Sequence, residues 1–174
     1  MFSSLTIRPI TEEDTDLILL WRNHPSVVKN FIYRRPFTRE GHLTWMREQV
    51  ATGKVVQFIV EADGEPVGSV YLRDVDTVHK KAEFGIFIGS EKARGKGYGT
   101  RATRLILKHA FEVMKLNRVF LRVFSDNKEA IRCYEKAGFS KEGLFREDVI
   151  LEGRPYDILF MSILKAEWEG ENHD

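Results

Sequence analysis

The stretch Lys92-Ala93-Arg94-Gly95-Lys96-Gly97-Tyr98-Gly99-Thr100, KARGKGYGT, places three alternating glycines between two segments of very different character. Residues 82–88 before it, AEFGIFI, form a short and largely apolar run that is typical of a buried strand. Residues 101–114 after it repeat apolar side chains at helical spacing, which is typical of an amphipathic helix. The sequence therefore predicts a strand, a glycine-rich basic turn and a helix in direct succession.

A glycine-rich turn between a strand and a helix has the chemistry of an anion site. Glycines at positions 95, 97 and 99 have no Cβ that would keep a ligand away from the backbone N–H groups. The helix N-terminus carries a partial positive charge, and Arg94 and Lys96 add full charges beside it. These features favour a bound phosphate, although a tight turn whose cations face solvent would have the same residues.

Two familiar phosphate-binding motifs do not fit this turn. A Walker A loop requires Ser or Thr after Gly-Lys, and here Gly97 follows Gly95-Lys96. The dinucleotide fingerprint GxGxxG requires a third glycine where Thr100 stands, and it normally opens a domain of several strand–helix units. The turn instead fits the pattern R/Q-x-x-G-x-G/A over residues 94–99.

The rest of the chain predicts further strands and helices, without a repeat, a low-complexity segment or a linker. Strands are expected at residues 5–10, 55–61, 67–74, 82–88, 119–124, 144–151 and 156–164. Helices are expected after the capping residues Thr11 and Thr38, at 101–114 and at 128–137. Because a long helix separates strands 82–88 and 119–124, these two strands should pair in parallel.

Length and composition restrict the class of protein. A chain of 174 residues fits one domain, and a formal net charge of +1 argues against a nucleic-acid-binding protein. The single cysteine, Cys133, favours a reducing compartment, and residues 1–10 lack the pattern of a secretory signal. The longest apolar run, residues 17–21, is too short to span a membrane. We therefore expect a cytoplasmic protein with neither nucleic-acid nor membrane partners, while a homo-oligomer stays open.

A second motif lies downstream of the turn. Residues 127–139, NKEAIRCYEKAGF, carry every fixed position of the pattern N-x-x-A-x-x-x-Y-x-x-x-G-F. With the turn at 94–99 in the right order and spacing, the chain resembles the GNAT superfamily, the acetyl-CoA-dependent N-acetyltransferases. The resemblance runs from about residue 5 to about residue 164, and it is greatest to the branch that holds ribosomal-protein and spermidine acetyltransferases.

The resemblance implies an α/β fold with a mixed, splayed central sheet flanked by helices, in a single domain over residues 1–165. The polar residues 166–174 are expected to fray. Acetyl-CoA, as a cosubstrate that needs no metal, would lie where strands 82–88 and 119–124 part, with an oxyanion donor near the end of the first strand. The residues implied to hold it are Gly85, Ile86, Phe87, Ile88, Arg94, Gly95, Lys96, Gly97, Tyr98, Gly99, Asn127, Ala130 and Tyr134.

Tyr134 is the first candidate catalytic residue. By the resemblance it is the general acid toward the coenzyme sulfur, whereas its spacing from Ala130 and Ala137 also fits a tyrosine of the core. The neighbouring Cys133 could in principle carry the acetyl group. Adjacent helical side chains point about 100° apart, and the sequence shows no paired histidine. We therefore expect a buried structural cysteine and direct transfer in a ternary complex.

Glu83 is the second candidate catalytic residue. Strand alternation places it on the same face as Phe87, four residues further on. It could take the amine proton through water, or it could anchor a cationic substrate. An ion pair with Lys80, Lys81 or some other cation is the alternative, because an unpaired carboxylate is rare in a buried strand.

The N-terminal segments bear on the acetyl acceptor. Residues 29–39 contain four cations and no carboxylate, which weakens a polyamine acceptor and favours one with phosphate or carboxylate groups. Residues 21–25, WRNHP, together with His42 and Trp45, resemble acetyltransferases of nucleotide-linked 4-amino sugars. That resemblance implies that Arg22 and His42 bind the nucleotide. Alternatively, Arg22 complements a helix C-terminus and His42 covers the edge of the core.

Three hypotheses about function follow. The first is an acetyl-CoA-dependent N-acetyltransferase that acts on a small-molecule amine, with an anionic amino-sugar nucleotide as the first acceptor. Polyamines such as spermidine, and protein N-terminal amines such as those of ribosomal proteins, are alternatives within this enzyme class. A non-catalytic acyl-CoA-binding module is the alternative of a different class, although Tyr134 and the glycine turn speak against it.

Overall fold

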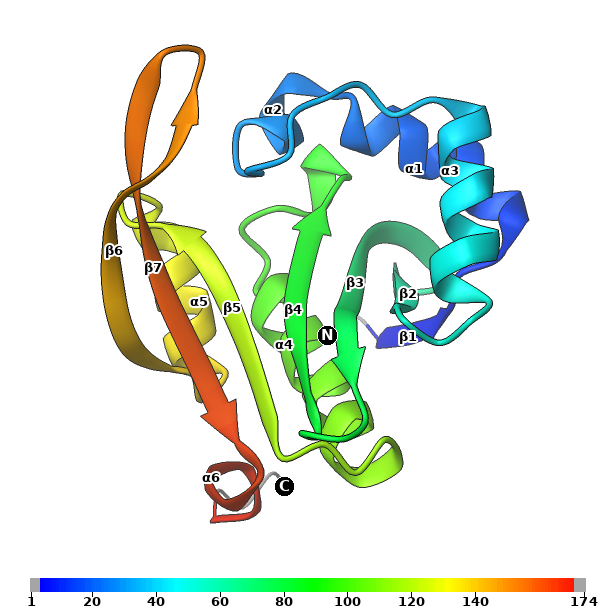
Figure 1. Cartoon of the computed structure of the whole chain (residues 1–174). Helices are drawn as coiled ribbons and strands as arrows, with labels where there is room; N and C mark the ends of the chain where they lie inside the picture. The colour runs from blue at the N-terminus through cyan, green and yellow to red at the C-terminus, as the bar shows by residue number, and fades with distance from the viewer. Residues whose placement is uncertain (1–3, 171–174) are drawn as a thin grey trace.

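The computed structural model describes residues 4–170. Over these residues the chain folds into a seven-stranded mixed sheet with helices on both faces (Figure 1). The strand order is β1-β2-β3-β4-β5-β7-β6. The strands are β1 (Leu5–Pro9), β2 (Val56–Ala62), β3 (Glu65–Asp76), β4 (Lys81–Ile88), β5 (Arg118–Phe124), β6 (Ser140–Leu151) and β7 (Arg154–Leu164).

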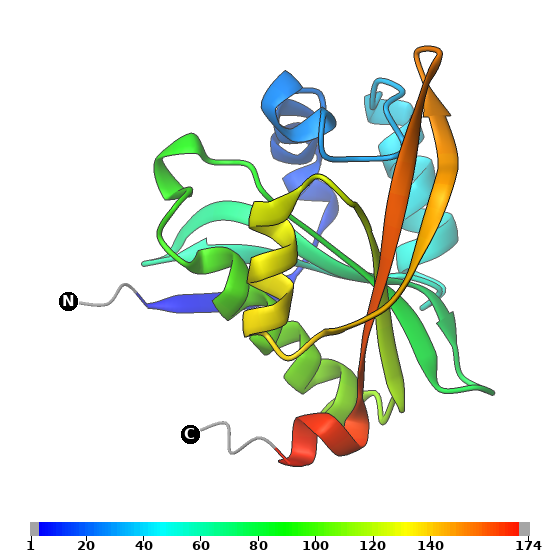
Figure 2. The same ribbon diagram turned by 90° about the vertical axis from the view of Figure 1, so that its left-hand side faces the viewer.

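The helices divide between the two faces of this sheet. Figures 1 and 2 show α4 and α5 on one face, while α1, α2 and α3 gather on the other side near the end of β4. The longer helices are α1 (Thr15–Arg22), α3 (Arg39–Trp45), α4 (Tyr98–Lys108), α5 (Lys128–Lys136) and α6 (Lys165–Gly170). The shorter segments are η1 (Glu12–Asp14), α2 (Pro25–Val28), η2 (Met46–Val50), η3 (Glu91–Ala93) and η4 (His109–Val113).

The parallel pairing of β4 and β5 confirms the crossover that the sequence predicts. Only three pairs join the two strands, and the last of them is Glu83 with Phe120. Beyond this pair, β4 continues to Ile88 beside β3, and β5 continues to Phe124 beside β7. The sheet is therefore splayed at β4 and β5, as the family resemblance implies.

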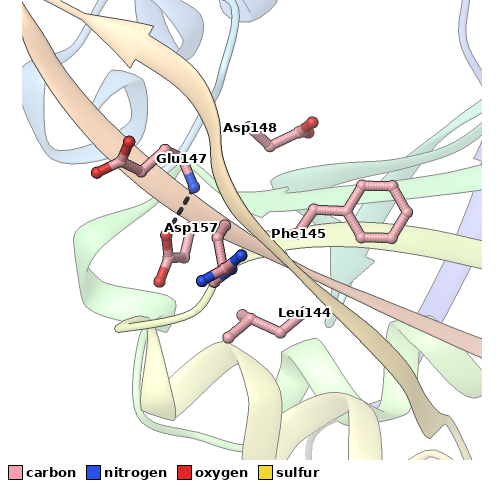
Figure 3. A pocket seen from close by; sticks show the side chains of 6 residues that line it. Leu144, Phe145, Glu147, Asp148 and Asp157 are labelled. Carbon is pink, nitrogen blue, oxygen red and sulfur yellow. Dashed lines mark hydrogen bonds between the residues drawn. The ribbon is translucent and has the colours of Figure 1, made fainter.

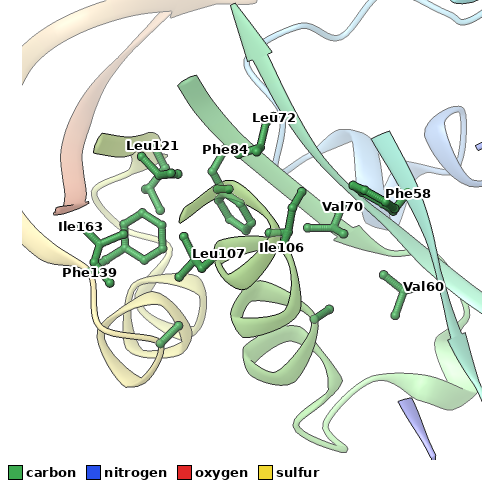
Figure 4. Close-up of a cluster of buried hydrophobic side chains, with 14 of the residues drawn as sticks. Phe58, Val60, Val70, Leu72, Phe84, Ile106, Leu107, Leu121, Phe139 and Ile163 are labelled. Carbon is green, nitrogen blue, oxygen red and sulfur yellow. The ribbon is translucent and has the colours of Figure 1, made fainter. Parts of the chain in front are cut away.

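Strand alternation divides the buried apolar side chains between two clusters. Phe58 and Val60 of β2 belong to the larger cluster, which surrounds Ile106 of α4 (Figure 4). Ile59, which lies between them in the sequence, belongs to a second cluster with Ile18 of α1. Complete burial of one such side chain stabilises the fold by roughly 1.5–3 kcal/mol. The sheet is therefore held from both faces, and each face has its own set of helices.

Local capping signals in the sequence correctly locate the first helices. The Thr11 N–H donates to Asp14 Oδ2 at 2.8 Å, in the predicted capping box. Thr38 Oγ1 accepts a hydrogen bond from the Gly41 N–H at 3.1 Å and caps α3. The short helix α2 is not predicted, and it begins at Pro25. Proline suits the first turn of a helix because its missing N–H has no partner there anyway.

The predicted fraying from residue 166 is wrong for the part of the tail that the structure describes. Residues Lys165–Gly170 form α6, and Trp168 is buried within it. The Trp168 ring packs at 5.9 Å from the ring of Phe111, between centroids. One large indole therefore attaches an otherwise polar helix to the core. Residues 171–174 of the predicted tail lie outside the described part of the chain.

The β6–β7 hairpin extends beyond the rest of the sheet (Figure 2). The register of the pair shifts between Phe145 and Val149, and Glu147 has a φ of 52°. There the Glu147 N–H donates to Asp157 Oδ1 at 2.7 Å (Figure 3). An open hollow of about 850 Å³ lies at this bulge, and none of the candidate site residues lines it.

Replacing Trp168 with alanine tests the packing of α6. We expect Trp168→Ala to lower the free energy of unfolding by about 3 kcal/mol, because a large buried side chain is removed. Urea unfolding of the full chain measures the change. Glu169→Ala on the same helix is the control, and it should stay within about 0.5 kcal/mol of the parent. Equal stability of both variants would show that the helix does not contribute to the core.

Candidate active site

The turn after β4 leaves backbone donors uncovered at the N-terminus of α4. Gly95 and Gly97 have φ angles of 72° and 75°, in the left-handed region that favours glycine. Gly97 directly precedes α4, and no side chain caps the helix there. Within the described residues, the first N–H groups of α4 therefore have no side-chain partner. Such a helix N-terminus binds phosphate.

The two cations of the turn have different roles in the structure. Arg94 Nε donates to the Ile88 carbonyl at 3.2 Å, and its Nη2 donates to Ser26 Oγ at 2.9 Å. These bonds fix the turn against the end of β4 and against α2. Lys96 is exposed at the tip of the turn. Of the two predicted phosphate-side cations, Arg94 is therefore the one that the fold positions.

Aromatic rings fix the backbone of β4 next to the split. A Cβ at Gly85 would lie 2.4 Å from the Tyr71 hydroxyl, and a Cβ at Gly89 would lie 2.1 Å from the Trp21 ring. Both rings therefore lie directly on the backbone, which only glycine allows. Phe87 packs edge-on against Trp21, with ring centroids 6.1 Å apart. These contacts hold the residues implied to bind the acetyl and pantetheine groups.

Tyr134 lies on α5, on the other side of the split. Its ring packs edge-on against Phe84 at 5.7 Å and tilted against Phe139 at 6.0 Å, between centroids. Burial raises the pKa of the Tyr134 hydroxyl above its ordinary value, and the nearby Cys133 and Tyr71 raise it further. The phenol therefore keeps its proton at neutral pH, and it can donate a hydrogen bond into the split.

Asn127 and Cys133 have local partners around α5. Asn127 Oδ1 accepts a hydrogen bond from the Ala130 N–H at 3.2 Å, which confirms the predicted N-cap. Cys133 Sγ lies 3.3 Å from Thr100 Oγ1 of α4. Burial is the main cause that raises the pKa of the Cys133 thiol. A protonated thiol that packs between two helices is a poor nucleophile.

Glu83 is buried at the last pair of β4 and β5, where two arginines hold its carboxylate. Arg73 of β3 places Nη2 at 3.0 Å and Nε at 3.1 Å from Oε2. Arg122 of β5 donates from Nε to Oε1 at 2.8 Å. The ion-pair alternative is thus present, with these arginines instead of Lys80 or Lys81. Because both oxygens already accept charge-assisted hydrogen bonds, Glu83 is poorly placed to act as the amine base.

Arg22 and His42 are both buried and only partly satisfied. The Arg22 guanidinium carbon lies 3.6 Å from the Phe31 ring centre and 4.5 Å from that of Phe37. His42 Nδ1 lies 3.1 Å from Thr15 Oγ1. Arg22 Nη1 and His42 Nε2 are buried without a hydrogen-bond partner in residues 4–170. Burial lowers the pKa of His42, so its imidazole is neutral at neutral pH.

One cavity of about 1030 Å³ connects these groups. The α4 turn and α5 line it on one face of the sheet, Arg22 and His42 line it on the other, and residues 83–88 lie between them. The residues singled out in the sequence are thereby brought together, except Lys96, which does not line the cavity. The fold thus offers a cofactor side and an acceptor side that meet at β4.

Tyr71, Arg73 and Arg122 are among the lining residues that the sequence does not predict. Each arginine lies in a largely apolar stretch of its strand, and an arginine at such a position indicates a charged partner. Their shared partner, Glu83, becomes visible only when three strands are aligned. Likewise, Tyr71 meets Gly85 because the register of β3 and β4 pairs them.

Comparison with known proteins decides the family. The family described as "Acetyltransferase (GNAT) domain" matches residues 4–140. The chain belongs to the GNAT acetyltransferases. The family match includes the α4 turn, α5 and the N-terminal helices, so the whole cavity described above lies within the GNAT domain.

Similar proteins extend over most of this GNAT chain. It is 31% identical over 170 residues to spermidine N(1)-acetyltransferase of Escherichia coli (strain K12), with 97% of this chain and 90% of the relative covered. It is 35% identical over 133 residues to YdaF of Bacillus subtilis (strain 168), named as a candidate ribosomal N-acetyltransferase, with 76% and 72% covered. A crystal structure of spermidine N-acetyltransferase from Vibrio cholerae in complex with CoA and spermine superposes with a TM-score of 0.88 at 25% identity, over 95% and 98% of the two chains.

Two further features of the GNAT chain concern membranes and metals. Across residues 4–170, no helix combines the length and the apolar character that crossing a bilayer requires. The same residues contain no group of three or more His, Cys, Asp or Glu side chains placed to hold a metal ion.

Replacing Gly97 with alanine tests the turn of this GNAT chain. Alanine in the left-handed region costs about 1–2 kcal/mol, and relief of that strain turns the N–H groups away from a bound diphosphate. We expect the Kd for CoA, measured by calorimetry, to rise about tenfold.

Gly53→Ala is the matched control for Gly97→Ala. Gly53 has a φ of 76°, and a Cβ there meets nothing within 4 Å, so the backbone strain is the same but lies outside the cavity. CoA affinity should be unchanged in this control. Equal affinity of both variants would remove the turn from CoA binding.

Proposed function

We propose that this acetyltransferase moves the acetyl group of acetyl-CoA to the primary amine of a small molecule, by direct attack in a ternary complex. The observation that carries the proposal is the cavity through the split sheet. The uncapped N-terminus of α4 lines this cavity on one face of the sheet. Two molecules can approach β4 from opposite faces and meet there. Holding both reactants in this geometry replaces a bimolecular encounter by an effectively unimolecular step.

The chain's own backbone fits the parts of CoA. The N–H groups at the start of α4, with Arg94 beside them, suit the diphosphate. Residues 85–88 continue β4 past its last pair with β5, so this edge of the strand can bind the amide groups of the pantetheine arm. An N–H near Phe87 or Ile88 would stabilise the oxyanion, a contribution of about 3 kcal/mol for one donor.

Tyr134 is proposed to assist the departing thiolate. When the amine nitrogen attacks the thioester carbon, the C–S bond breaks and the sulfur becomes negative. Full transfer from a phenol of pKa about 10 to a thiolate of pKa about 8.5 is uphill by about 2 kcal/mol. Burial raises the pKa of Tyr134 and makes full transfer harder. We therefore assign Tyr134 a strong hydrogen bond to the sulfur, with the proton shared as the bond breaks.

Polyamines are the acceptors that the relatives favour. The relatives named for spermidine acetylation cover almost this whole chain, and one structure of such a protein holds spermine beside CoA. This supports a polyamine acceptor over the nucleotide-linked amino sugar that the sequence places first. A linear amine would enter from the side of α1 to α3 and present one terminal nitrogen at β4.

An amine that also carries negative charge is the second candidate acceptor. Among the described residues, the carboxylates of Glu83 and Glu129 are the two that line the cavity, and arginines already pair with the first. The cations that line its acceptor side are Arg22, Lys29, Arg73 and Arg122, whereas Arg94, Arg132 and Lys136 lie at the α4 turn and on α5. Arg22 is buried with Nη1 unpartnered among the described residues. A polycation gains little in such surroundings, whereas a phosphate or carboxylate would find direct partners.

Release of free CoA thiol across a panel of amines separates these acceptors. The panel contains spermidine, spermine, a nucleotide-linked amino sugar, glucosamine with and without a 6-phosphate, and a peptide with a free N-terminus. A polyamine acceptor predicts turnover that rises with the positive charge of the amine, and an anionic acceptor predicts the reverse order. Tight acetyl-CoA binding without turnover on any amine would favour the non-catalytic module and overturn the proposed activity.

Tyr134→Phe tests the role of the phenol. We expect kcat to fall by about a hundredfold, as for other positioned proton donors, while the Kd for CoA stays the same. The contact with Phe84 is retained because the ring is retained. Tyr156→Phe removes a hydroxyl from β7 outside the cavity and is the control. An unchanged kcat in Tyr134→Phe would remove this residue from the mechanism.

A further inference from the structure

A three-residue ionic cluster lies at the closed end of the split, and the transfer reaction does not account for it. Arg73 comes from β3, Glu83 from β4 and Arg122 from β5. The carboxylate of Glu83 lies between the two guanidinium groups, at 3.0 Å from Arg73 Nη2 and 2.8 Å from Arg122 Nε. All three residues line the acceptor side of the cavity.

The cluster has more positive charge and more donors than its carboxylate can use. Among the groups of the cluster that line the cavity, two guanidinium groups and one carboxylate leave one positive charge in surplus. The carboxylate of Asp74 lies 4.0 Å from Arg73 Nε, but it is exposed and does not line the cavity. Within residues 4–170, Arg122 bonds only through Nε, so its two Nη amino groups have no partner. The arginine side chains are 39% and 29% exposed, whereas that of Glu83 is 8% exposed. The carboxylate is thus covered, and both arginines, which carry the unused N–H groups, line the cavity.

We propose that the Arg73–Glu83–Arg122 cluster binds a negatively charged group of the acceptor, a phosphate or a carboxylate. Guanidinium groups bind both anions through paired N–H donors. Glu83 does not contact the anion in this arrangement, and its carboxylate, which lies between the two arginines, neutralises part of their charge. This inference rests on the proposed acetyl transfer and deepens the second acceptor class.

The position of the cluster predicts the spacing within the acceptor. Glu83 lies two residues before Gly85 and four before Phe87 on β4. A strand rises about 3.3 Å per residue, which places the anion roughly 7–13 Å from the amine that attacks beside Gly85 to Phe87. An acceptor that fits therefore carries its primary amine and its anionic group at this separation, as small phosphorylated or nucleotide-linked amines do.

A purely structural role is the competing explanation. The cluster joins β3, β4 and β5 where the sheet begins to part, so it could simply hold the strands together. Both roles predict that replacing either arginine impairs the protein. They differ for Glu83→Gln. If the cluster is only structural, this variant loses the carboxylate that joins the two arginines. If the cluster binds an anion, the variant gains positive charge, because the surplus positive charge rises from one to two.

Titration with inorganic phosphate tests the proposal without needing the natural acceptor. The ¹⁵N-labelled full chain is first saturated with CoA, so that the N-terminus of α4 is occupied, and the arginine Nε–H resonances are then followed by NMR. We expect saturable shifts of Arg73 and Arg122. Phosphate affinity should fall about tenfold in Arg73→Gln and in Arg122→Gln, the loss of one charged hydrogen-bonded contact. It should rise in Glu83→Gln.

Two variants serve as controls for this titration. Arg47→Gln removes a charge from the exposed surface outside the cavity and should leave phosphate affinity unchanged. Arg22→Gln removes another arginine of the cavity, whose Nη1 has no hydrogen-bond partner in residues 4–170, and should leave the shifts of Arg73 and Arg122 in place.

Three results would overturn the inference: no saturable shift in the parent chain, parent-like affinity in both arginine variants, or weaker phosphate binding in Glu83→Gln. Calorimetry with CoA alone on the same samples distinguishes the two proposals. A chain that binds CoA but not phosphate loses the anion site only, and a chain that does not bind CoA loses the proposed transferase activity.

Discussion

The early end of the pairing between β4 and β5 is the constraint on which the rest of the site depends. A buried backbone N–H or C=O without a partner costs free energy, so parallel strands normally stay paired along their length. Here β4 continues beyond Glu83 with β3 as its partner on one edge and the cavity on the other. The exposed strand edge is a template for a ligand with amide groups. The rings of Tyr71 and Trp21 contact Gly85 and Gly89 and thereby keep this edge of β4 in place.

Strand alternation then assigns the two reactants to opposite faces. Phe84 packs in the cluster around α4, whereas Phe87 packs in the cluster around α1. The helices α4 and α5, which we propose bind the cofactor, therefore lie on one side of β4, and the N-terminal helices lie on the other. A direct transfer needs both molecules bound at once, and a sheet that parts between two helical layers provides this. Tyr134 and the arginines of the acceptor side are separate because the sheet lies between them.

The features that the sequence predicts depend on residues that are close together in the chain, whereas the features that it misses depend on residues that are far apart in it. The glycine turn, the caps at Thr11, Thr38 and Asn127, and the parallel crossover all follow from signals within a few residues or one helix length. The partners of Glu83 do not, because Arg73 and Arg122 meet it only through the registers of three strands. Trp168 shows the same limit. One apolar residue in a polar segment gives no periodicity, and only its contact with Phe111 makes it part of the core.

The charges around the cavity depend on side chains that the shared fold does not determine. At 31% identity over 170 residues, the backbone and the cofactor turn can persist while most side chains of the acceptor side change. Arg22 is the clearest case. Three phenyl rings surround its guanidinium, which compensates part of the cost of burial, yet Nη1 has no acceptor in the described chain. A buried donor of this kind costs free energy until an acceptor reaches it. An anionic group can supply that acceptor and a polyamine cannot, so these side chains bear on the proposed acceptor class independently of the fold.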